Sequence, residues 1–327
     1  DEETKKDYIL HKTETEQRLS KLAAFITKKA VTKDGTVIQI FANIGSVDEA
    51  KIAEKEGADG IGLFRTEFLF MRSAEQNELL DEHTQYNSYT EVLEIMKGKP
   101  VTIRTLDAGG DKVIPMEGMP GQNEKNPLLG NRAIRFCLSR PDIFKTQLRA
   151  LYRAGVHGKL KIMLPLLTDL DQLKKTKKLI HEVHVELESE KIPFNKDIPL
   201  GIMIETPAAA IIADLFASQC DFFSIGTNDL TQYTISVDRD NMQTAYLFSE
   251  MHPAVLRMIR YTAASAHQAG IPVSVCGEMA SRTESLELLI GLGIRNISMS
   301  PGKISEVKSF LSQKTLSQMK ETADTIQ

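Results

Sequence analysis

The feature that most constrains the fold is a repeated alternation of short apolar runs and helical segments. Eight runs rich in apolar and β-branched residues recur along the chain, each followed by a segment of helical periodicity or a long loop. Strands that alternate with helices form a parallel sheet, and eight such units favour a closed (β/α)8 TIM barrel over an open doubly wound sheet. The expected strands are residues 37–43, 60–64, 101–106, 160–165, 200–204, 222–226, 273–276 and 296–300.

Capping residues mark the starts of several expected helices. Ser46 and Glu49 have the spacing of a capping box, and Ser281 and Glu284 repeat it. Thr206 stands directly before a proline, which is typical of an N-cap followed by the first helical position. These signals place helices immediately after the expected strands.

The start of the chain differs from the rest. Leu19, Leu22, Ile26 and Ala30 recur at helical spacing among charged residues. We therefore expect a linker helix over residues 1–30 and a single barrel domain over residues 31–327, a length that suits a large α/β barrel. The linker helix begins abruptly without a cap, which indicates a piece of a longer protein.

Composition excludes several classes of protein. Lys and Arg number 40 against 44 Asp and Glu, and no basic run is present, so nucleic acid is not an expected partner. The cysteines Cys137, Cys220 and Cys276 are far apart and form no C-x-x-C pair, which argues against a disulfide framework or a zinc site. No segment has the pattern of a membrane span or a signal peptide, so a cytoplasmic location is expected.

Arginines near the ends of expected strands indicate an anionic ligand. The carboxyl ends of barrel strands meet at one face, where Arg65 and Arg104 would lie together. The guanidinium group binds phosphate or carboxylate through paired hydrogen bonds, so a phosphorylated ligand is favoured. Arg132 and Arg135 share a helical face and add to this, although either could instead be a surface residue. The long loop over residues 107–130 is a lid or binding loop, or else disordered.

Two carboxylates at the ends of neighbouring expected strands suit a divalent cation. Glu205 and Asp229 could supply both protein ligands of a Mg²⁺ ion, which takes its other ligands from water and substrate phosphate. Mn²⁺ would use the same oxygens. The alternative is a general acid/base pair without metal, and the neighbouring arginines favour the metal.

Cys276 is the one cysteine expected at the mouth of the barrel, where a thiol could donate a proton or act as a nucleophile. A buried structural role is the commoner fate of a cysteine, and we assign it to Cys137 and Cys220.

Long motifs resemble the carboxyl-terminal domain of Enzyme I, the phosphoenolpyruvate-protein phosphotransferase of the bacterial sugar phosphotransferase system. The matching stretches are residues 62–71, 103–112, 201–210, 222–233 and 237–239. The resemblance implies a barrel that binds phosphoenolpyruvate and Mg²⁺ and forms a homodimer. It also implies an amino-terminal domain whose histidine accepts the phosphoryl group and passes it to the histidine phosphocarrier protein. No histidine of this chain has the sequence context of that acceptor, so we expect the carboxyl-terminal half alone.

The resemblance also implies roles for individual residues. Glu205 and Asp229 are expected to bind the metal, and Cys276 is expected to protonate the methylene carbon as enolpyruvate becomes pyruvate. Asn131 and Ser281 depart from the family pattern at loop positions near the expected site. The residues expected to contact phosphoenolpyruvate are Arg65, Arg104, Arg132, Arg239 and Asn228, with Lys112 as a weaker candidate.

Two alternative functions remain open from the sequence. The homologous domain of a phosphoenolpyruvate synthase or pyruvate phosphate dikinase would share the arginines, carboxylates and cysteine. A non-catalytic module that senses phosphoenolpyruvate and dimerises would bind the ligand normally but would not support phosphoryl transfer.

Overall fold

The computed structural model describes residues 22–75, 80–110, 112, 114, 118–120 and 124–325. Eight parallel strands, β2 to β9, pair in sequence order, and pairing of β9 with β2 closes the barrel. The predicted (β/α)8 barrel is therefore confirmed. The strands are β2 (Val37–Ile44), β3 (Ile61–Arg65), β4 (Val101–Arg104), β5 (Leu160–Leu164), β6 (Leu200–Ile204), β7 (Phe223–Ile225), β8 (Val273–Val275) and β9 (Asn296–Met299).

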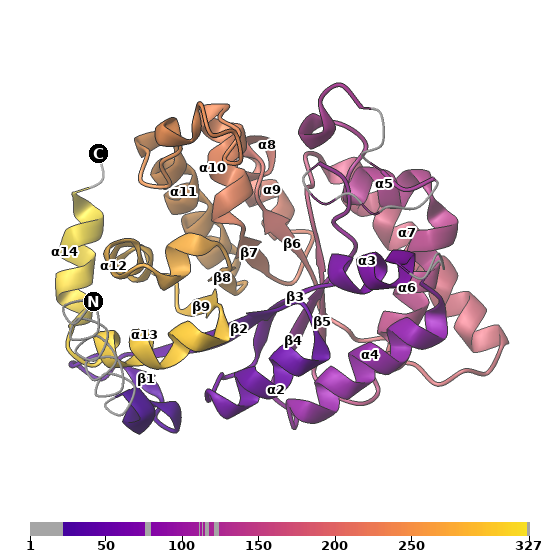
Figure 1. Ribbon diagram of the computed structural model, residues 1–327, viewed down its shortest axis with the longest axis horizontal. Coiled ribbons are helices and arrows are strands. Elements are labelled where there is room, and N and C mark those ends of the chain that lie inside the picture. Colours follow the sequence, from indigo (N-terminus) through magenta and orange to yellow (C-terminus); the bar gives the residue numbers. More distant parts are fainter. Residues whose placement is uncertain are drawn as a thin grey trace, which may run out of the picture.

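Helices surround the strands (Figure 1). Short 3-10 turns, among them η1 (Pro127–Leu129) and η3 (Glu278–Ser281), lie in the loops. Beyond a short helical stretch at 22–26, the helices of the described part of the chain are α2 (Val47–Lys55), α3 (Glu67–Glu75), α4 (Glu82–Ile95), α5 (Ile134–Ser139), α6 (Pro141–Ala154), α7 (Leu170–Ser189), α8 (Pro207–Ile211), α9 (Ala213–Ala217), α10 (Thr227–Ile235), α11 (Pro253–Ala269), α12 (Thr283–Gly291), α13 (Ile304–Leu311) and α14 (Leu316–Asp324).

The buried apolar residues form two clusters. The larger cluster packs the outward strand faces against the helices, as expected for parallel strands that are covered on both sides. The smaller cluster fills the barrel interior with Leu63, Met163, Met203, Phe222 and Cys276. Cys276 thus lies at the top of an apolar plug, beside the loops that follow the strands.

The start of the described chain differs in part from the expected linker helix. Residues 1–21 lie outside the described residues, and 22–26 are helical. Ala30 belongs instead to a short strand, β1 (Ala30–Val31), which pairs antiparallel with Val37 and Ile38. A turn at Gly35, whose φ of 85° suits glycine, returns the chain for this pairing. The division at residue 30 stays a prediction.

Capping predictions met different outcomes. Thr206 caps α8 by accepting a hydrogen bond from Ala209 N at 3.1 Å. Ser46 caps α2 through Glu49 N, but the Glu49 carboxylate accepts from Gly45 N. The capping box at Ser281 is wrong, because that hydroxyl donates to the Glu278 carbonyl within η3.

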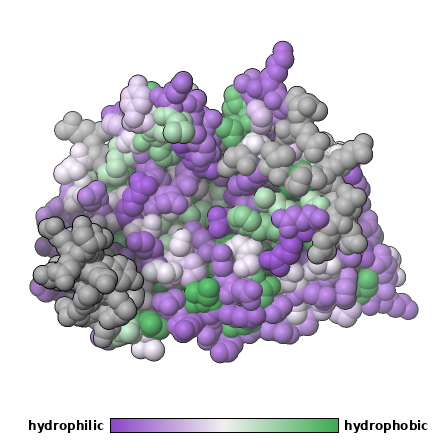
Figure 2. Space-filling model, in the orientation of Figure 1, coloured by the Kyte–Doolittle hydropathy of each residue, from purple (hydrophilic) through white to green (hydrophobic). Residues whose placement is uncertain are grey.

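The described residues contain no helix that is both long and apolar enough to cross a membrane. The face in Figure 2 is mostly hydrophilic, with scattered smaller hydrophobic areas.

Candidate functional site

A polar pocket of about 180 Å³ lies at the carboxyl ends of the barrel strands. Eight of the nine residues predicted for the site line it, and the exception is Arg132. Arg65 and Arg104 end β3 and β4, and Glu205 directly follows β6. Asn228 and Asp229 lie in the first turn of α10, which begins two residues after the end of β7. The barrel topology therefore brings together side chains that are far apart in the sequence.

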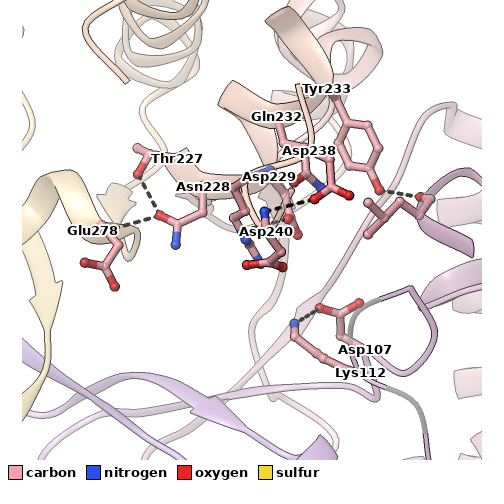
Figure 3. A network of polar contacts seen from close by, with 12 residues as sticks. Asp107, Lys112, Thr227, Asn228, Asp229, Gln232, Tyr233, Asp238, Asp240 and Glu278 are labelled. Carbon is pink, nitrogen blue, oxygen red and sulfur yellow. Dashed lines mark hydrogen bonds and ion pairs between the residues drawn. The ribbon is translucent and has the colours of Figure 1, made fainter. Parts of the chain in front are cut away.

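Arg104 and Lys112 share two buried carboxylates on one side of the pocket. The Arg104 guanidinium lies 2.8 Å from Glu67 Oε1 and 3.0 Å from Asp107 Oδ2. Lys112 Nζ donates to Asp107 Oδ2 at 2.6 Å (Figure 3). Burial alone would raise the pKa of Asp107, but Lys112, Arg104 and Arg132 hold that pKa well below its usual value. Sequence reasoning named neither carboxylate, although both lie within the matched motifs.

Arg132 lies behind the pocket, and its side chain is fully buried. Its Nη2 is 2.9 Å from Asp107 Oδ1 and 3.5 Å from Asp229 Oδ2. Its Nη1 donates to the Tyr233 hydroxyl at 3.1 Å, and that hydroxyl donates to the Leu128 carbonyl at 2.5 Å. Tyr233 and Asp229 are four residues apart on α10 and therefore share a helical face (Figure 3). Arg132 thus joins the loop after β4 to α10.

Two carboxylates define a candidate cation position. Glu205 Oε1 accepts a hydrogen bond from Leu166 N at 2.6 Å, and Asp229 Oδ1 lies 3.2 Å from Arg239 Nη1. Burial, together with the nearby Asp229 carboxylate, raises the pKa of Glu205 to about 8. A divalent cation beside both carboxylates would offset this cost of ionisation. The described residues contain no group of three or more His, Cys, Asp and Glu side chains placed to hold a metal.

Cys276 is almost completely buried at the end of β8, where its thiol faces the Ile225 carbonyl at 3.7 Å. Burial raises the pKa of the Cys276 thiol to about 11, so the thiol keeps its proton at neutral pH. A protonated thiol in a pocket can act as an acid. Cys137 is buried away from the pocket, and Cys220 is partly buried; burial raises the pKa of Cys220 to about 12.

The opposite wall of the pocket is held by amide and backbone contacts. Asn228 Oδ1 accepts from Glu278 N at 2.9 Å and from the Thr227 hydroxyl at 3.5 Å (Figure 3). This contact ties the start of α10 to the loop that follows Cys276. Ser281 lines the same wall.

Two of the residues considered from sequence lie away from the pocket. The Arg135 guanidinium donates to the carbonyls of Leu129 and Gly130, so it supports the loop before α5. Asn131 is exposed, and its backbone N–H donates to Glu124 Oε1 at 3.0 Å. Neither side chain lines the pocket.

Several buried donors in the site have no hydrogen-bond acceptor in the described part of the chain. Among the residues that line the pocket these are the Nε atoms of Arg65 and Arg104, and Arg132 Nε lies behind it. Unpaired buried donors are costly in a folded protein. A pocket lined by Arg65, Arg104, Lys112 and Arg239 therefore suits an anion with several oxygen atoms.

Comparison with known proteins agrees with this chemistry. The family model described as "PEP-utilising enzyme, PEP-binding domain" matches residues 20–316. The chain belongs to this family. It is 42% identical to phosphoenolpyruvate-protein phosphotransferase of Priestia megaterium over 99% of this chain and 56% of that protein. It is 43% identical to the protein of that name in Bacillus subtilis (strain 168), over 89% of this chain and 50% of that protein.

This member of the PEP-utilising family thus spans about half the length of the curated relatives it matches. Solved structures show the same fold at low identity. A citrate lyase from Burkholderia xenovorans LB400 has a TM-score of 0.50 at 15% identity, covering 87% of this chain and 81% of that chain. A HpcH/HpaI aldolase/citrate lyase family protein from Burkholderia cenocepacia J2315 has a TM-score of 0.51 at 13% identity, covering 88% and 95%.

Proposed function

We propose that this chain is the phosphoenolpyruvate- and metal-binding catalytic domain of a phosphoenolpyruvate-protein phosphotransferase. The observation that carries the proposal is one pocket in which four cationic side chains, two adjacent carboxylates and a buried thiol meet at the carboxyl ends of the strands. Phosphoryl transfer requires neutralised charge and positioned groups, and enolpyruvate requires a proton to become pyruvate. The pocket offers groups for both tasks.

Arg65, Arg104 and Arg239 would bind the phosphate and carboxylate of phosphoenolpyruvate, with Lys112 as a further cation and Asn228 as a polar contact. Paired carboxylates hold the Arg104 and Lys112 side chains in place before the ligand arrives. Such preorganised charges stabilise the transferring phosphoryl group without further rearrangement. A direct ligand contact by Arg132 stays a prediction, since its guanidinium contacts Asp107, Asp229 and Tyr233.

Glu205 and Asp229 would hold Mg²⁺, or Mn²⁺ with the same oxygen ligands. The fit rests on the donor set, because two neighbouring carboxylates of which one has a raised pKa suit a divalent cation. When bound, the cation would neutralise charge on the phosphoryl oxygens. The chain's own part is to present the two carboxylates at one place on the rim.

Cys276 would protonate the methylene carbon of enolpyruvate. Its proton leaves sulfur and forms a C–H bond with the electron pair of the enolate carbon, and the thiolate regains a proton from water. The raised pKa of the Cys276 thiol keeps that proton available at neutral pH.

The wider system is also proposed. The phosphoryl group would pass to a histidine on a separate amino-terminal domain, then to the histidine phosphocarrier protein during sugar uptake in the cytoplasm. The chain would act as a homodimer. The names of the relatives favour this assignment over a phosphoenolpyruvate synthase or pyruvate phosphate dikinase.

Calorimetric titration of this chain with phosphoenolpyruvate, with and without Mg²⁺, tests the site. Saturable binding that depends on the metal supports the proposal, and no binding under either condition contradicts it. Addition of the amino-terminal domain of a relative then distinguishes an enzyme from a sensing module. Pyruvate formation with phosphorylated histidine supports the phosphotransferase, whereas normal ligand binding without transfer supports the sensor.

A further inference from the structure

Asn43, near the end of β2, joins three strands at the mouth of the barrel. Its Nδ2 donates to the Cys276 carbonyl at 2.9 Å and to the Ser298 carbonyl at 3.4 Å. Its Oδ1 accepts from the Ser298 hydroxyl at 2.5 Å. Because β9 lies between β2 and β8, the Asn43 side chain reaches across β9 to the residue that follows β8.

Gly62 provides the space that this arrangement needs. A Cβ atom at Gly62 would lie 2.4 Å from Ser298 Oγ and 2.6 Å from Ser298 Cβ. A larger residue would therefore displace the serine whose hydroxyl donates to Asn43 Oδ1. The two backbone carbonyls fix the amide orientation, since a carbonyl can only accept and must face Nδ2. The Ser298 hydroxyl can donate or accept, and it donates to the Oδ1 atom that this orientation presents.

The backbone of Cys276 is held from two sides. Its N–H donates to the Ile225 carbonyl of β7 at 3.1 Å, and its carbonyl accepts from Asn43. The last ladder pair between β8 and β9 is Val275 with Ile297, so Cys276 lies beyond the regular pairing. Asn43 therefore replaces the missing ladder contact on the β9 side. Without it, the hydrogen bond from the Cys276 N–H to the Ile225 carbonyl is the backbone contact of Cys276 that remains among the described residues.

We propose that Asn43 is a positioning residue that directs the Cys276 thiol toward the carbon that accepts the proton. This inference rests on the proposed role of Cys276 as proton donor. Proton transfer depends steeply on the distance and direction between donor and carbon. Loss of the Asn43 contact should slow proton transfer while leaving the cations that bind phosphate and carboxylate in place.

Exchange of the pyruvate methyl protons with deuterium provides a direct measurement. In that exchange the Cys276 thiolate accepts a proton as a C–H bond of pyruvate breaks and the enolate forms. The thiol then exchanges this proton with D₂O, and its deuteron forms the new C–D bond as the thiolate is restored. The chain is incubated with pyruvate and Mg²⁺ in D₂O, and NMR follows the loss of the methyl proton signal. We expect exchange by Asn43→Ala to be about tenfold slower or more, with an affinity for phosphoenolpyruvate within about threefold of wild type, about 0.65 kcal/mol.

Ser298→Ala is a second variant that leaves the Asn43 amide in place. It removes only the hydroxyl that donates to Oδ1 and helps to hold the amide, so exchange should slow in the same direction but less than in Asn43→Ala. Asn195→Ala is the matched control, because Asn195 Nδ2 also donates to a backbone carbonyl, that of Gly155, but away from the pocket. Exchange by Asn195→Ala should equal that of wild type. Thermal unfolding establishes that each variant is folded.

The outcomes separate this inference from the proposed function. If wild type shows no exchange, or if Cys276→Ala exchanges as fast as wild type, the proton-donor role fails and the inference fails with it. If Cys276→Ala is slow while Asn43→Ala and Ser298→Ala match wild type, the inference alone is overturned. If Asn43→Ala weakens phosphoenolpyruvate binding as much as it slows exchange, Asn43 contacts the ligand directly and the positioning role is wrong.

Discussion

Arg132 and Asp107 form an ion pair in which both side chains are almost wholly buried, with Nη2 2.9 Å from Oδ1. The same Nη2 lies 3.5 Å from Asp229 Oδ2. One guanidinium therefore compensates two carboxylates, one beside the proposed phosphate-binding cations and one at the proposed metal position. Removal of this charge would leave both carboxylates buried with less compensation.

Arg132→Met should lower the free energy of unfolding by about 3–5 kcal/mol, the range for breaking a buried ion pair. Urea unfolding measures the loss. Arg140→Met is the control, because Arg140 pairs with Asp142 at 2.7 Å on the exposed surface and its loss should cost less than about 1 kcal/mol. Equal losses in the two variants would contradict this account of Arg132.

Stability without metal should fall as the pH rises from about 4.5 to about 8. Glu205 in the folded chain keeps its proton up to about pH 8, whereas in the unfolded chain it loses that proton near the ordinary value of 4.5. The folded state therefore binds more protons in this window, and ionisation opposes folding by at most about 1.4 kcal/mol per pH unit. Urea unfolding across this range, compared with Glu205→Gln, measures the slope. An unchanged slope in Glu205→Gln would show that Glu205 does not titrate there.

Glu205→Ala should abolish the Mg²⁺ dependence of phosphoenolpyruvate binding. One of two proposed protein ligands is lost, and Mg²⁺ gains little from a single remaining carboxylate in a pocket rich in cations. Calorimetry at zero and saturating Mg²⁺ measures the difference. Full retention of the dependence would remove Glu205 from the metal site.

Cys276→Ala should slow turnover, measured with the amino-terminal domain of a relative, by about 100-fold or more while changing phosphoenolpyruvate affinity little. Because the pKa of the thiol is raised to about 11, proton donation by the wild-type chain should persist past pH 9 and be lost only as the pH approaches 11. Turnover across pH 7–10 tests this directly. A loss of turnover centred near pH 9 would indicate an ordinary exposed thiol.

Gln147→Met should weaken phosphoenolpyruvate binding, because the Gln147 side chain holds residues next to Arg104 in position. Gln147 Oε1 accepts from Leu106 N at 2.9 Å, and its Nε2 donates to the hydroxyls of Thr66 and Tyr89 at 3.2 Å each. Loss of this partner leaves the buried Leu106 N–H unpaired, at a cost of about 1–3 kcal/mol in stability. Tyr89→Phe keeps the Leu106 contact, so calorimetry should find its affinity unchanged. If Gln147→Met and wild type have equal affinities for phosphoenolpyruvate, the hydrogen bonds of Gln147 do not affect ligand binding.

Periodicity located the strands well because each is a short apolar run closed by a helix signal. The expected strand at 200–204 coincides with β6, and that at 296–300 differs from β9 by one residue. Ala30 was misplaced because its helical spacing to Ile26 carries no information about the antiparallel contact with Ile38. At Ala30, pairing with a strand later in the sequence determines the secondary structure, and the local helical spacing does not.

Within the site, strand ends and motifs indicated the charged residues that line the pocket. The sequence did not indicate the residues that form ion pairs and hydrogen bonds with these side chains. Glu67 and Asp107 are buried counter-ions of Arg104, and Asn43 contacts Cys276 across β9, but spacing along one chain does not report such contacts. They depend on which loops follow neighbouring strands and how deeply each side chain lies. The burial of Arg132 behind the pocket could not be predicted from the sequence for the same reason.

The position of Arg132 between Asp107 and Asp229 has a consequence for cooperativity. A cation bound at Asp229 would neutralise that carboxylate and weaken its ion pair with the Arg132 guanidinium. Arg132 would then interact more strongly with Asp107, and this would alter the interaction of Asp107 with Lys112. Two ligands that influence one shared group alter each other's affinity by the same factor. Phosphoenolpyruvate should therefore raise the affinity for Mg²⁺ by the same factor as Mg²⁺ raises the affinity for phosphoenolpyruvate. Each ligand should bind more weakly when the other is absent.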